Sequence, residues 1–211
     1  MTAAGDARRT GILGGSFDPP HLGHLHAALA AADAFGLDEV LLIPAARPPH
    51  KPGRVLVAGE HRVALLELLA TADPRLRVDP RELSREGPSY TVDTLRELLA
   101  EGYTGLHLIL GTDNVPGLPE WRAVDEILSL AQPVVVQREE EPEQVLAELQ
   151  GRLAPELLER LRAGLLSLPP VEASSTALRA ALEAGRVAGE ELPGELRAYL
   201  DEHGLYGPVG E

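Results

Sequence analysis

The sequence predicts an α/β fold in which helices cover both faces of a doubly wound parallel sheet. Short apolar runs alternate with amphipathic stretches along the chain, as they do where crossover helices join neighbouring strands. One run, Val40–Ile43, is continuously apolar, which is typical of a central parallel strand buried on both faces. A glycine turn joins the first apolar run directly to the first helical stretch. These three features together indicate a parallel sheet.

The first crossing from strand to helix spans residues 14–24, Gly-Gly-Ser-Phe-Asp-Pro-Pro-His-Leu-Gly-His. Residues 11–13 before it read as a short buried strand, and apolar residues from Leu22 onward recur at helical spacing. Backbone N–H groups and the positive end of a helix meet at such a crossing and stabilise an anion. His21 and His24, three residues apart, project from the same side of the first turn. Either histidine alone reads as a surface or capping residue, but the whole string indicates a phosphate site.

A proline-rich loop at residues 45–52 follows the strand at 40–43 and carries Arg47, His50 and Lys51. Its prolines can neither continue the strand nor enter a helix, so we expect a stiff loop that presents these three side chains outward. The loop lies at the carboxyl end of a strand, where open α/β sheets bind their ligands. This position favours a functional role over a mere connection.

The remaining elements continue the alternation. Strands are expected at residues 76–78, 106–110, 133–136 and 165–168, and helices at 60–70, 92–100, 144–162 (interrupted near Gly151 and Pro155) and 192–203. Residues 82–87 are expected to form a polar loop. Gly111 ends the strand at 106–110, and Asp113 behind it is placed either to bind a ribose hydroxyl or to cap the next segment. Trp121, the one tryptophan, is by itself more often a core residue than a platform for a ligand.

A second anion site is predicted at residues 173–179, Ala-Ser-Ser-Thr-Ala-Leu-Arg. The hydroxyl groups of Ser174, Ser175 and Thr176 cap a helix and, with its first N–H groups, form an anion-binding nest. Arg179 lies one turn further and shares the face of Ser175 and Thr176, so its guanidinium can point back toward the helix end. A cap alone would not need this arginine.

Composition limits what the chain can do. Its 211 residues, 44% apolar, suffice for one domain, so we expect a single domain over residues 1–211, with residues 1–10 as a flexible N-terminal extension. No apolar run could span a bilayer and residues 1–10 lack an apolar signal stretch, so we expect a cytoplasmic protein without a membrane partner. The net charge of -14 argues against a nucleic-acid partner. The absence of cysteine excludes disulfides and thiolate chemistry; a homo-oligomer stays open.

The chain resembles the bacterial nicotinate-nucleotide adenylyltransferase family, a member of the nucleotidyltransferase superfamily that carries a His-x-Gly-His motif after the first strand of a Rossmann-like sheet. The matching motifs are the string at 14–24, Pro-Pro-His-Lys at 48–51, Pro-Ser-Tyr-Thr at 88–91, Gly-Thr-Asp at 111–113, Trp121, Ser-x-Thr-x-x-Arg at 174–179 and Gly-Leu-Tyr at 204–206. The block at 88–91 and Trp121 single out this family within the superfamily. Ala173 departs from the family pattern. Arg138 matches a family arginine, but the acidic run that follows it is unlike the usual short turn.

The resemblance implies that the protein joins nicotinate mononucleotide to ATP and releases deamido-NAD and pyrophosphate. It implies three catalytic residues, His21, His24 and Arg179. The expected ATP-binding residues are Gly14, Gly15, Ser16, Phe17, His50, Lys51, Gly111, Ser174, Ser175 and Thr176. The expected residues for the mononucleotide are Tyr90 and Thr91, whose backbone N–H groups would meet the nicotinate carboxylate, Asp113, and Trp121, which would stack on the pyridine ring.

ATP as a substrate implies Mg²⁺. The sequence shows no cluster of carboxylates that would form a dedicated protein site for it, so we expect phosphates and water to hold the ion. A phosphate monoester is already anionic at neutral pH, so the acceptor needs no general base.

Two other interpretations stay open. Another adenylyl- or cytidylyltransferase of the superfamily, such as phosphopantetheine adenylyltransferase, shares the first and last motifs, but the block at 88–91 and Trp121 argue against it. A nucleotide-binding module without turnover would need no charge on the leaving group, so His21, His24 and Arg179 argue against that one.

Overall fold

The computed structural model describes residues 8–50, 53, 55–137, 142–168, 173–186 and 191–207. They form a six-stranded sheet with helices on both faces, and every strand pair is parallel, which confirms the predicted Rossmann-like fold class. The strands are β1 (Thr10–Gly15), β2 (Glu39–Pro44), β3 (Leu76–Val78), β4 (Leu106–Gly111), β5 (Gln132–Val136) and β6 (Leu165–Leu166). Their order in the sheet is β3-β2-β1-β4-β5-β6, so β3 and β6 are the edge strands.

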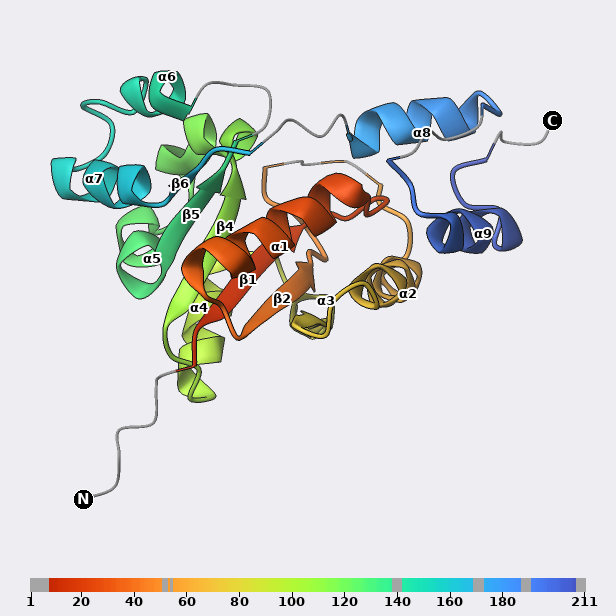
Figure 1. The fold of residues 1–211 in the computed structure, drawn as a ribbon, viewed down its shortest axis with the longest axis horizontal. Helices are drawn as coiled ribbons and strands as arrows, with labels where there is room; N and C mark the ends of the chain where they lie inside the picture. Colours follow the sequence, from red (N-terminus) through yellow and green to blue (C-terminus); the bar gives the residue numbers. More distant parts are fainter. Residues whose placement is uncertain are drawn as a thin grey trace.

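Helices of the described residues cover both faces of the sheet (Figure 1). They are α1 (Leu22–Phe35), α2 (Gly59–Ala70), α3 (Arg81–Ser84), α4 (Thr91–Ala100), the 3-10 helix η1 (Thr112–Glu120), α5 (Val124–Leu130), α6 (Pro142–Ala147), α7 (Pro155–Ala163), α8 (Ser175–Glu183) and α9 (Gly194–Glu202). Among the described residues, no helix is both long enough and apolar enough to cross a membrane.

Two hydrophobic clusters pack against opposite faces of the sheet, because successive strand residues point to opposite sides. Leu13 and Ile109 belong to the cluster that includes residues of α1, α2, α8 and α9. Their chain neighbours Ile12 and Leu110 belong to the cluster formed with α4, η1, α5, α6 and α7. The central strands therefore have apolar side chains on both faces, as the run at 40–43 predicts.

Helix α1 lies close to the sheet because its inward face is built from alanines. Ala28 and Ala31 have no exposed surface, and such small side chains let the helix backbone approach the strands. Gly36, in the left-handed conformation with φ of 60°, ends the helix. The close packing fixes the start of α1 directly beyond the carboxyl end of β1.

The structure differs from the sequence prediction at several short elements. Residues 81–84 form a helical turn, α3, where a polar loop is expected, because Glu82 is drawn into the interior. Helix α5 and the long 3-10 helix η1 were not predicted. Helix α5 has only seven residues and η1 contains prolines, so neither has a clear helical period in the sequence. The stretch 144–162 is interrupted as predicted and forms α6 and α7, with Pro155 as the first residue of α7.

The start of the described chain differs from the prediction that residues 1–10 form a flexible extension. Thr10 is the first residue of β1, and the backbone N–H of Arg9 donates to Asp38, so residues 9 and 10 belong to the folded part. Residues 1–7 lie outside the described residues, as do Lys51 and Arg138. Helices α8 and α9 lie beyond α2, on the side of the molecule away from α5, α6 and α7 (Figure 1).

Candidate active site

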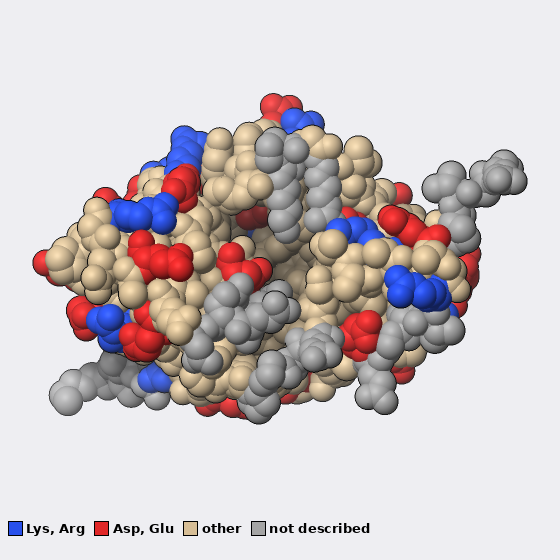
Figure 2. Space-filling model, turned by 90° about the horizontal axis from the view of Figure 1, so that it is seen from above, with Lys and Arg blue, Asp and Glu red and all other residues tan. Residues whose placement is uncertain are grey.

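A hollow at the carboxyl edge of the sheet lies where the strand order reverses. After β1 the chain adds β2 and β3 on one side of this strand and then β4, β5 and β6 on the other side. Open α/β sheets usually bind their ligands at such a reversal of strand order. Figure 2 shows this face hollowed in its middle, with mostly uncharged residues around the opening. The hollow has two adjoining parts of about 910 and 880 Å³. Both parts share the lining residues Gly14, Gly15, Ser16, Ile109, Leu110, Asn114 and Trp121.

One part, here the histidine hollow, is also lined by Phe17, Asp18, His21, His24, Gly111, Asp113, Ser174, Ser175 and Thr176. The start of α1 forms one wall of it. His21 is the N-cap residue of α1, and its Nδ1 accepts a hydrogen bond from the N–H of Gly23 at 3.1 Å. His24 Nδ1 accepts in turn from the N–H of His21 at 3.2 Å, which completes a reciprocal capping box. The capping interpretation and the functional one therefore apply to the same two residues.

This capping fixes the chemistry of the two imidazoles. A ring nitrogen that accepts a hydrogen bond carries no proton, so a neutral ring must carry its proton on Nε2. The two rings lie side by side, with centroids 3.9 Å apart. Gly23 permits this arrangement, because a Cβ there would lie 3.0 Å from the His21 ring. His21 and His24 thus form a pair of donors in the wall of the histidine hollow.

The start of α8 lies beside the start of α1 and is tied to the turn before it. Ser175 Oγ donates to the carbonyl of Pro19 at 2.9 Å, and Arg179 Nη1 donates to the carbonyl of Asp18 at 2.6 Å. Arg179 Nη2 donates to Thr176 Oγ1 at 3.1 Å, so arginine and hydroxyl share one face, as their spacing predicts. The structure therefore brings Ser174, Ser175 and Thr176 to the histidine hollow, more than 150 residues after the turn before α1. Arg179 bonds that turn but is not among the lining residues of either hollow.

The other part, here the tyrosine hollow, is lined among others by His50, Glu82, Ser89, Tyr90, Thr91, Thr94 and Arg122. Helix α4 begins at Thr91, and no side chain caps it, so its first N–H groups face the hollow without a partner in the helix. The guanidinium of Arg122 lies over the Tyr90 ring, 4.7 Å from its centroid. The positive helix end and the Arg122 cation make this hollow suitable for an anionic group.

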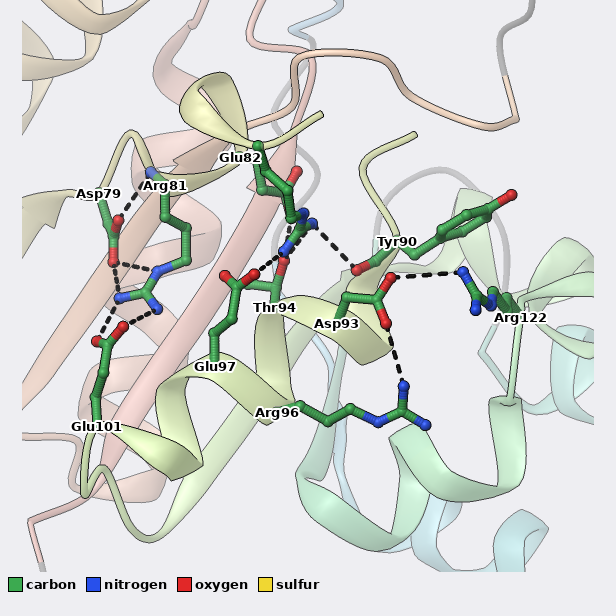
Figure 3. Close-up of polar contacts among 11 residues, drawn as sticks. Asp79, Arg81, Glu82, Tyr90, Asp93, Thr94, Arg96, Glu97, Glu101 and Arg122 are labelled. Carbon is green, nitrogen blue, oxygen red and sulfur yellow. Dashed lines mark hydrogen bonds and ion pairs between the residues drawn. The ribbon is translucent and has the colours of Figure 1, made fainter. Parts of the chain in front are cut away.

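A network of charged side chains holds the segment that carries Tyr90 (Figure 3). Thr94 Oγ1 donates to the buried carboxylate of Glu82 at 2.5 Å, and Arg85 donates to Thr94 and to Glu97. Ser89 Oγ accepts from the N–H groups of the loop after β2, at residues 46 and 47. Burial raises the pKa of Glu82, although the hydrogen bonds from Thr94 and Ser89 and the charge of Arg85 lower it. The network ties α3, α4 and the loop after β2 into one wall.

The structure places most of the predicted site residues at this double hollow. His50, predicted to bind ATP, lies in the tyrosine hollow, and Asp113, predicted to bind the mononucleotide, lies in the histidine hollow. Both assignments stay predictions. Lys51 lies outside the described residues. Arg47 is exposed, as expected for its loop.

Several lining residues have no role in the sequence prediction, among them Asp18, Glu82, Asn114 and Arg122. Asp18 stands inside the string at 14–24, after its two glycines and before its two histidines, so its position in the sequence was a usable signal. Glu82 and Arg122 carry no such signal, because only the packing of α3 and η1 brings them to the hollow. Among the described residues, no group of three or more histidine, aspartate or glutamate side chains is arranged to hold a metal ion.

Comparison with known proteins places this hollow in a family context. Residues 12–181 match the family model described as cytidylyltransferase-like. A probable nicotinate-nucleotide adenylyltransferase of Dehalococcoides mccartyi is 39% identical over 200 residues, which cover 94% of this chain and 97% of the relative. A protein with the same description from Roseiflexus sp. is 42% identical over 196 residues, covering 93% and 96%.

Solved structures agree with this fold at low sequence identity. The Plasmodium falciparum nicotinic acid mononucleotide adenylyltransferase complexed with NaAD has a TM-score of 0.72 and 17% identity, covering 94% of this chain and 97% of that chain. A second structure of that protein, complexed with APC, has a TM-score of 0.70 and 16% identity. At these identities the likeness shows a common fold.

Proposed function

The chain belongs to the nicotinate-nucleotide adenylyltransferase family of cytidylyltransferase-like proteins, and we propose that its double hollow transfers AMP from ATP to nicotinate mononucleotide. The products are deamido-NAD and pyrophosphate, a step of NAD biosynthesis. The observation that carries the assignment is the pairing of two hollows across the Gly14–Ser16 turn. One presents donors from two helix ends, and the other presents an aromatic wall and an uncapped helix. This arrangement suits a triphosphate facing an aromatic acid.

The reaction is an in-line displacement at phosphorus. An oxygen of the mononucleotide phosphate forms a bond to the α-phosphorus of ATP, and the bond from that phosphorus to the bridging oxygen of pyrophosphate breaks. The acceptor phosphate is anionic near neutral pH, because the second pKa of a phosphate monoester is about 6. The protein therefore has to position the two phosphates and to stabilise the charge that develops on the leaving group.

The imidazoles supply part of this stabilisation. With Nδ1 of His21 and of His24 engaged by backbone N–H groups, each ring offers Nε2–H as its donor. A triphosphate in the histidine hollow would receive these donors together with the N–H groups of the Gly14–Ser16 turn. Because the capping bonds fix both rings beforehand, little reorganisation is needed during the reaction.

Helix α8 supplies the charge for the leaving group. Its N-terminus and the hydroxyl groups at residues 174–176 form a nest for the β- and γ-phosphates. Arg179 adds a fixed cation, since hydrogen bonds to Asp18 and Thr176 restrict its guanidinium. The developing negative charge on pyrophosphate then meets an arginine that is already oriented.

The tyrosine hollow would take the acceptor. Of the two N–H groups predicted to meet the carboxylate, that of Tyr90 donates to the carbonyl of Pro88 at 3.0 Å. The N–H of Thr91, joined by that of Val92 in the first turn of α4, would take this role, and the helix dipole favours a negative charge there. Trp121 lines both hollows, and its indole offers a surface for the pyridine ring. Nicotinate differs from nicotinamide by this carboxylate, so the hollow is suited to the acid.

Magnesium would enter with ATP. Among the described residues, Asp18 and Asp113 are the carboxylates that line the histidine hollow, and Asp18 accepts a hydrogen bond from Tyr206 at 2.5 Å. The ion would be held by phosphates and water and would neutralise part of their charge. A cytoplasmic location is part of the proposal, whereas the oligomeric state is left open.

The test is pyrophosphate release from ATP and Mg²⁺ with three acceptors: nicotinate mononucleotide, nicotinamide mononucleotide and phosphopantetheine. We expect a strong preference for the first. Release with phosphopantetheine alone would keep the reaction class and discard the substrate. Release with none of them, together with tight ATP binding, would favour the binding module without turnover.

A further inference from the structure

Ser89 stands just before the start of α4, but its side chain does not cap that helix. It is buried, and it binds a segment that lies more than 40 residues earlier in the sequence. Its Oγ accepts from the N–H of Ala46 at 2.9 Å and from the N–H of Arg47 at 3.2 Å. Its own N–H donates to the carbonyl of Arg47 at 2.9 Å. Three hydrogen bonds thus attach Ser89 to the loop after β2.

The two N–H groups that Ser89 accepts from are the last backbone donors before His50. Residues 48 and 49 are prolines, which have no N–H, so this part of the loop can bond only through its carbonyls. One residue before these donors, Ala45 donates to the carbonyl of Gly15 at the end of β1. Ser89 is therefore the last point at which backbone N–H groups hold the described part of the loop before it reaches His50.

The hydroxyl of Ser89 is itself oriented by its surroundings. A hydroxyl oxygen has two lone pairs, and two N–H groups occupy them, so its proton is directed to a third group. The hydrogen bond from Ser89 is one of the interactions that lower the pKa of Glu82, although burial raises it. Glu82 is buried on α3 and also accepts from Thr94 Oγ1 of α4 at 2.5 Å. The loop after β2 is thus joined to a wall that is fixed from two helices.

The loop that Ser89 holds brings His50 to Trp121. The imidazole and the indole are stacked, and both residues line the tyrosine hollow. His50 is exposed, so the course of its backbone, and not burial in a core, places its ring. The contact between the two rings therefore depends on how firmly residues 46–50 are held.

We propose that Ser89 is a positioning residue for the acceptor nucleotide: it fixes residues 46–50 so that His50 covers one face of the Trp121 indole and leaves the other face to the pyridine ring. The inference rests on the proposed function, because it concerns the substrate that is placed in the tyrosine hollow there. The effect of Ser89 on this substrate passes through His50 and Trp121.

The physical basis of this effect is preorganisation of the hollow. Without the Ser89 oxygen, the N–H groups of Ala46 and Arg47 can turn to water, and the loop can take other paths. The indole then loses its partner on one face, and the acceptor has to order both rings when it binds. Ordering a loop and its side chains on binding weakens affinity. The loss should appear in the binding of the mononucleotide, because the triphosphate of ATP is placed in the histidine hollow.

The experiment is a double-mutant cycle on the full-length protein with Ser89→Ala and His50→Ala. We expect Ser89→Ala to raise the KM for nicotinate mononucleotide about 3- to 10-fold and to change kcat and the KM for ATP less than about 2-fold. In the His50→Ala background the same substitution should change the KM for the mononucleotide less than about 2-fold, because the group through which it acts is gone.

Ser129→Ala is the matched control, because it removes a hydroxyl that donates to the carbonyl of Glu126 within α5 and lines neither hollow. It should leave kcat and both KM values unchanged. If Ser89→Ala does not fold, Ser89→Cys takes its place in the cycle, because a thiol has a similar size and accepts hydrogen bonds only weakly.

A purely structural role of Ser89 would give a different pattern. The KM for the mononucleotide would then rise by the same factor with and without His50, or it would stay unchanged while Tm falls. Either result overturns the proposal. A rise in the KM for ATP alone would also overturn it, since His50 would then serve the nucleotide that the sequence predicts for it.

A readout that needs no turnover separates this inference from the proposed function. Trp121 is the one tryptophan of the chain, so tryptophan fluorescence reports on this indole alone. Loss of the imidazole from one face opens the indole to a soluble quencher, so Ser89→Ala and His50→Ala should each raise the acrylamide quenching constant. The double variant should raise it no further than His50→Ala does.

The two proposals can then fail separately. A wild-type protein that releases no pyrophosphate with any acceptor would overturn the function, and the quenching cycle would still decide whether Ser89 holds His50 on the indole. An unchanged quenching constant in Ser89→Ala, in a protein that does transfer AMP to nicotinate mononucleotide, would overturn the inference alone.

Discussion

The imidazole of His50 stacks on the indole of Trp121, with the ring centroids 5.3 Å apart and the planes inclined by 22°. The contact joins the loop after β2 to the end of η1, across the mouth of the tyrosine hollow. One face of the indole is thus already covered by an aromatic ring. A pyridine ring has to use the other face or displace His50.

Replacing this indole should affect one substrate far more than the other. Stacking of a base on an aromatic side chain contributes about 1–3 kcal/mol, so Trp121→Ala should raise the KM for nicotinate mononucleotide about 10-fold or more. The KM for ATP should change less than 3-fold. Steady-state kinetics with each substrate varied in turn would check this, and equal effects on both constants would contradict the stacking role.

The paired histidines should affect turnover more than binding. His24→Ala removes one fixed donor from the histidine hollow, and loss of such a donor typically costs about 100- to 1000-fold in kcat. It also removes the acceptor for the His21 N–H, so a cost of about 1 kcal/mol in the free energy of unfolding is expected. Stopped-flow kinetics and urea unfolding would separate the two effects. A large rise in the KM for ATP with kcat unchanged would argue against catalysis.

Discrimination between acid and amide should depend on Arg122 and not on Arg96. Both guanidinium groups pair with Asp93, at 3.6 Å and 3.2 Å, but of the two only Arg122 lines the tyrosine hollow. Figure 3 shows each arginine joined to a different oxygen of this carboxylate. Arg122→Gln should lower the ratio of kcat/KM for nicotinate over nicotinamide mononucleotide about 3- to 10-fold, which corresponds to about 0.6–1.4 kcal/mol. Arg96→Gln is the matched control, and the same loss of discrimination there would point to a general charge effect.

The buried carboxyl of Glu82 should leave a signature in the pH dependence of stability. Burial raises its pKa above the ordinary value of 4.5, so the folded state binds the proton more tightly than the unfolded state does. Stability linked to this group is then fully present below about pH 4.5 and decreases as the pH rises through the raised value. Glu82→Gln removes this titration. The Tm of the wild type should therefore rise relative to that of Glu82→Gln as the pH falls from 7 toward 4.5, and a constant difference would contradict the shift.

Gly164 should be among the positions least tolerant of a larger residue. A Cβ at this position would lie 1.9 Å from the carbonyl oxygen of Pro133, on a neighbouring strand. Backbone has to move to relieve such an overlap, so Gly164→Ala should cost about 2–3 kcal/mol in the free energy of unfolding. Gly194→Ala, with nothing within 4 Å of the added carbon, is the control and should change stability by less than about 1 kcal/mol.

The sequence predicted the elements that carry strong local patterns. The strand at 40–43 has an uninterrupted apolar run, and the string at 14–24 combines glycines, prolines and histidines in one turn, so both were placed correctly. The meeting of Arg179 with Asp18 depends on chain topology, which no local pattern contains. Spacing predicted the shared face of Thr176 and Arg179, but it did not predict that Arg179 bonds the carbonyl of Asp18.

The missed residues show the same limit. Glu82 stands in a segment that reads as a polar loop, and its burial follows from contacts with Thr94 and Ser89 made only in the folded chain. Arg122 follows Trp121 at a turn, where the left-handed conformation of Ala123 redirects the chain. Sequence patterns report burial along one element, whereas these positions are defined by the contact of two elements.

The hydrogen bond between Tyr206 and Asp18 spans 188 residues of sequence. During synthesis the chain emerges from its N-terminus, and long-range contacts have to wait for their later partner. The strand and turn that carry the histidines are therefore synthesised long before Tyr206, whose hydroxyl donates to Asp18 in that turn. A nascent chain that has not yet reached Tyr206 would therefore carry an incomplete hollow.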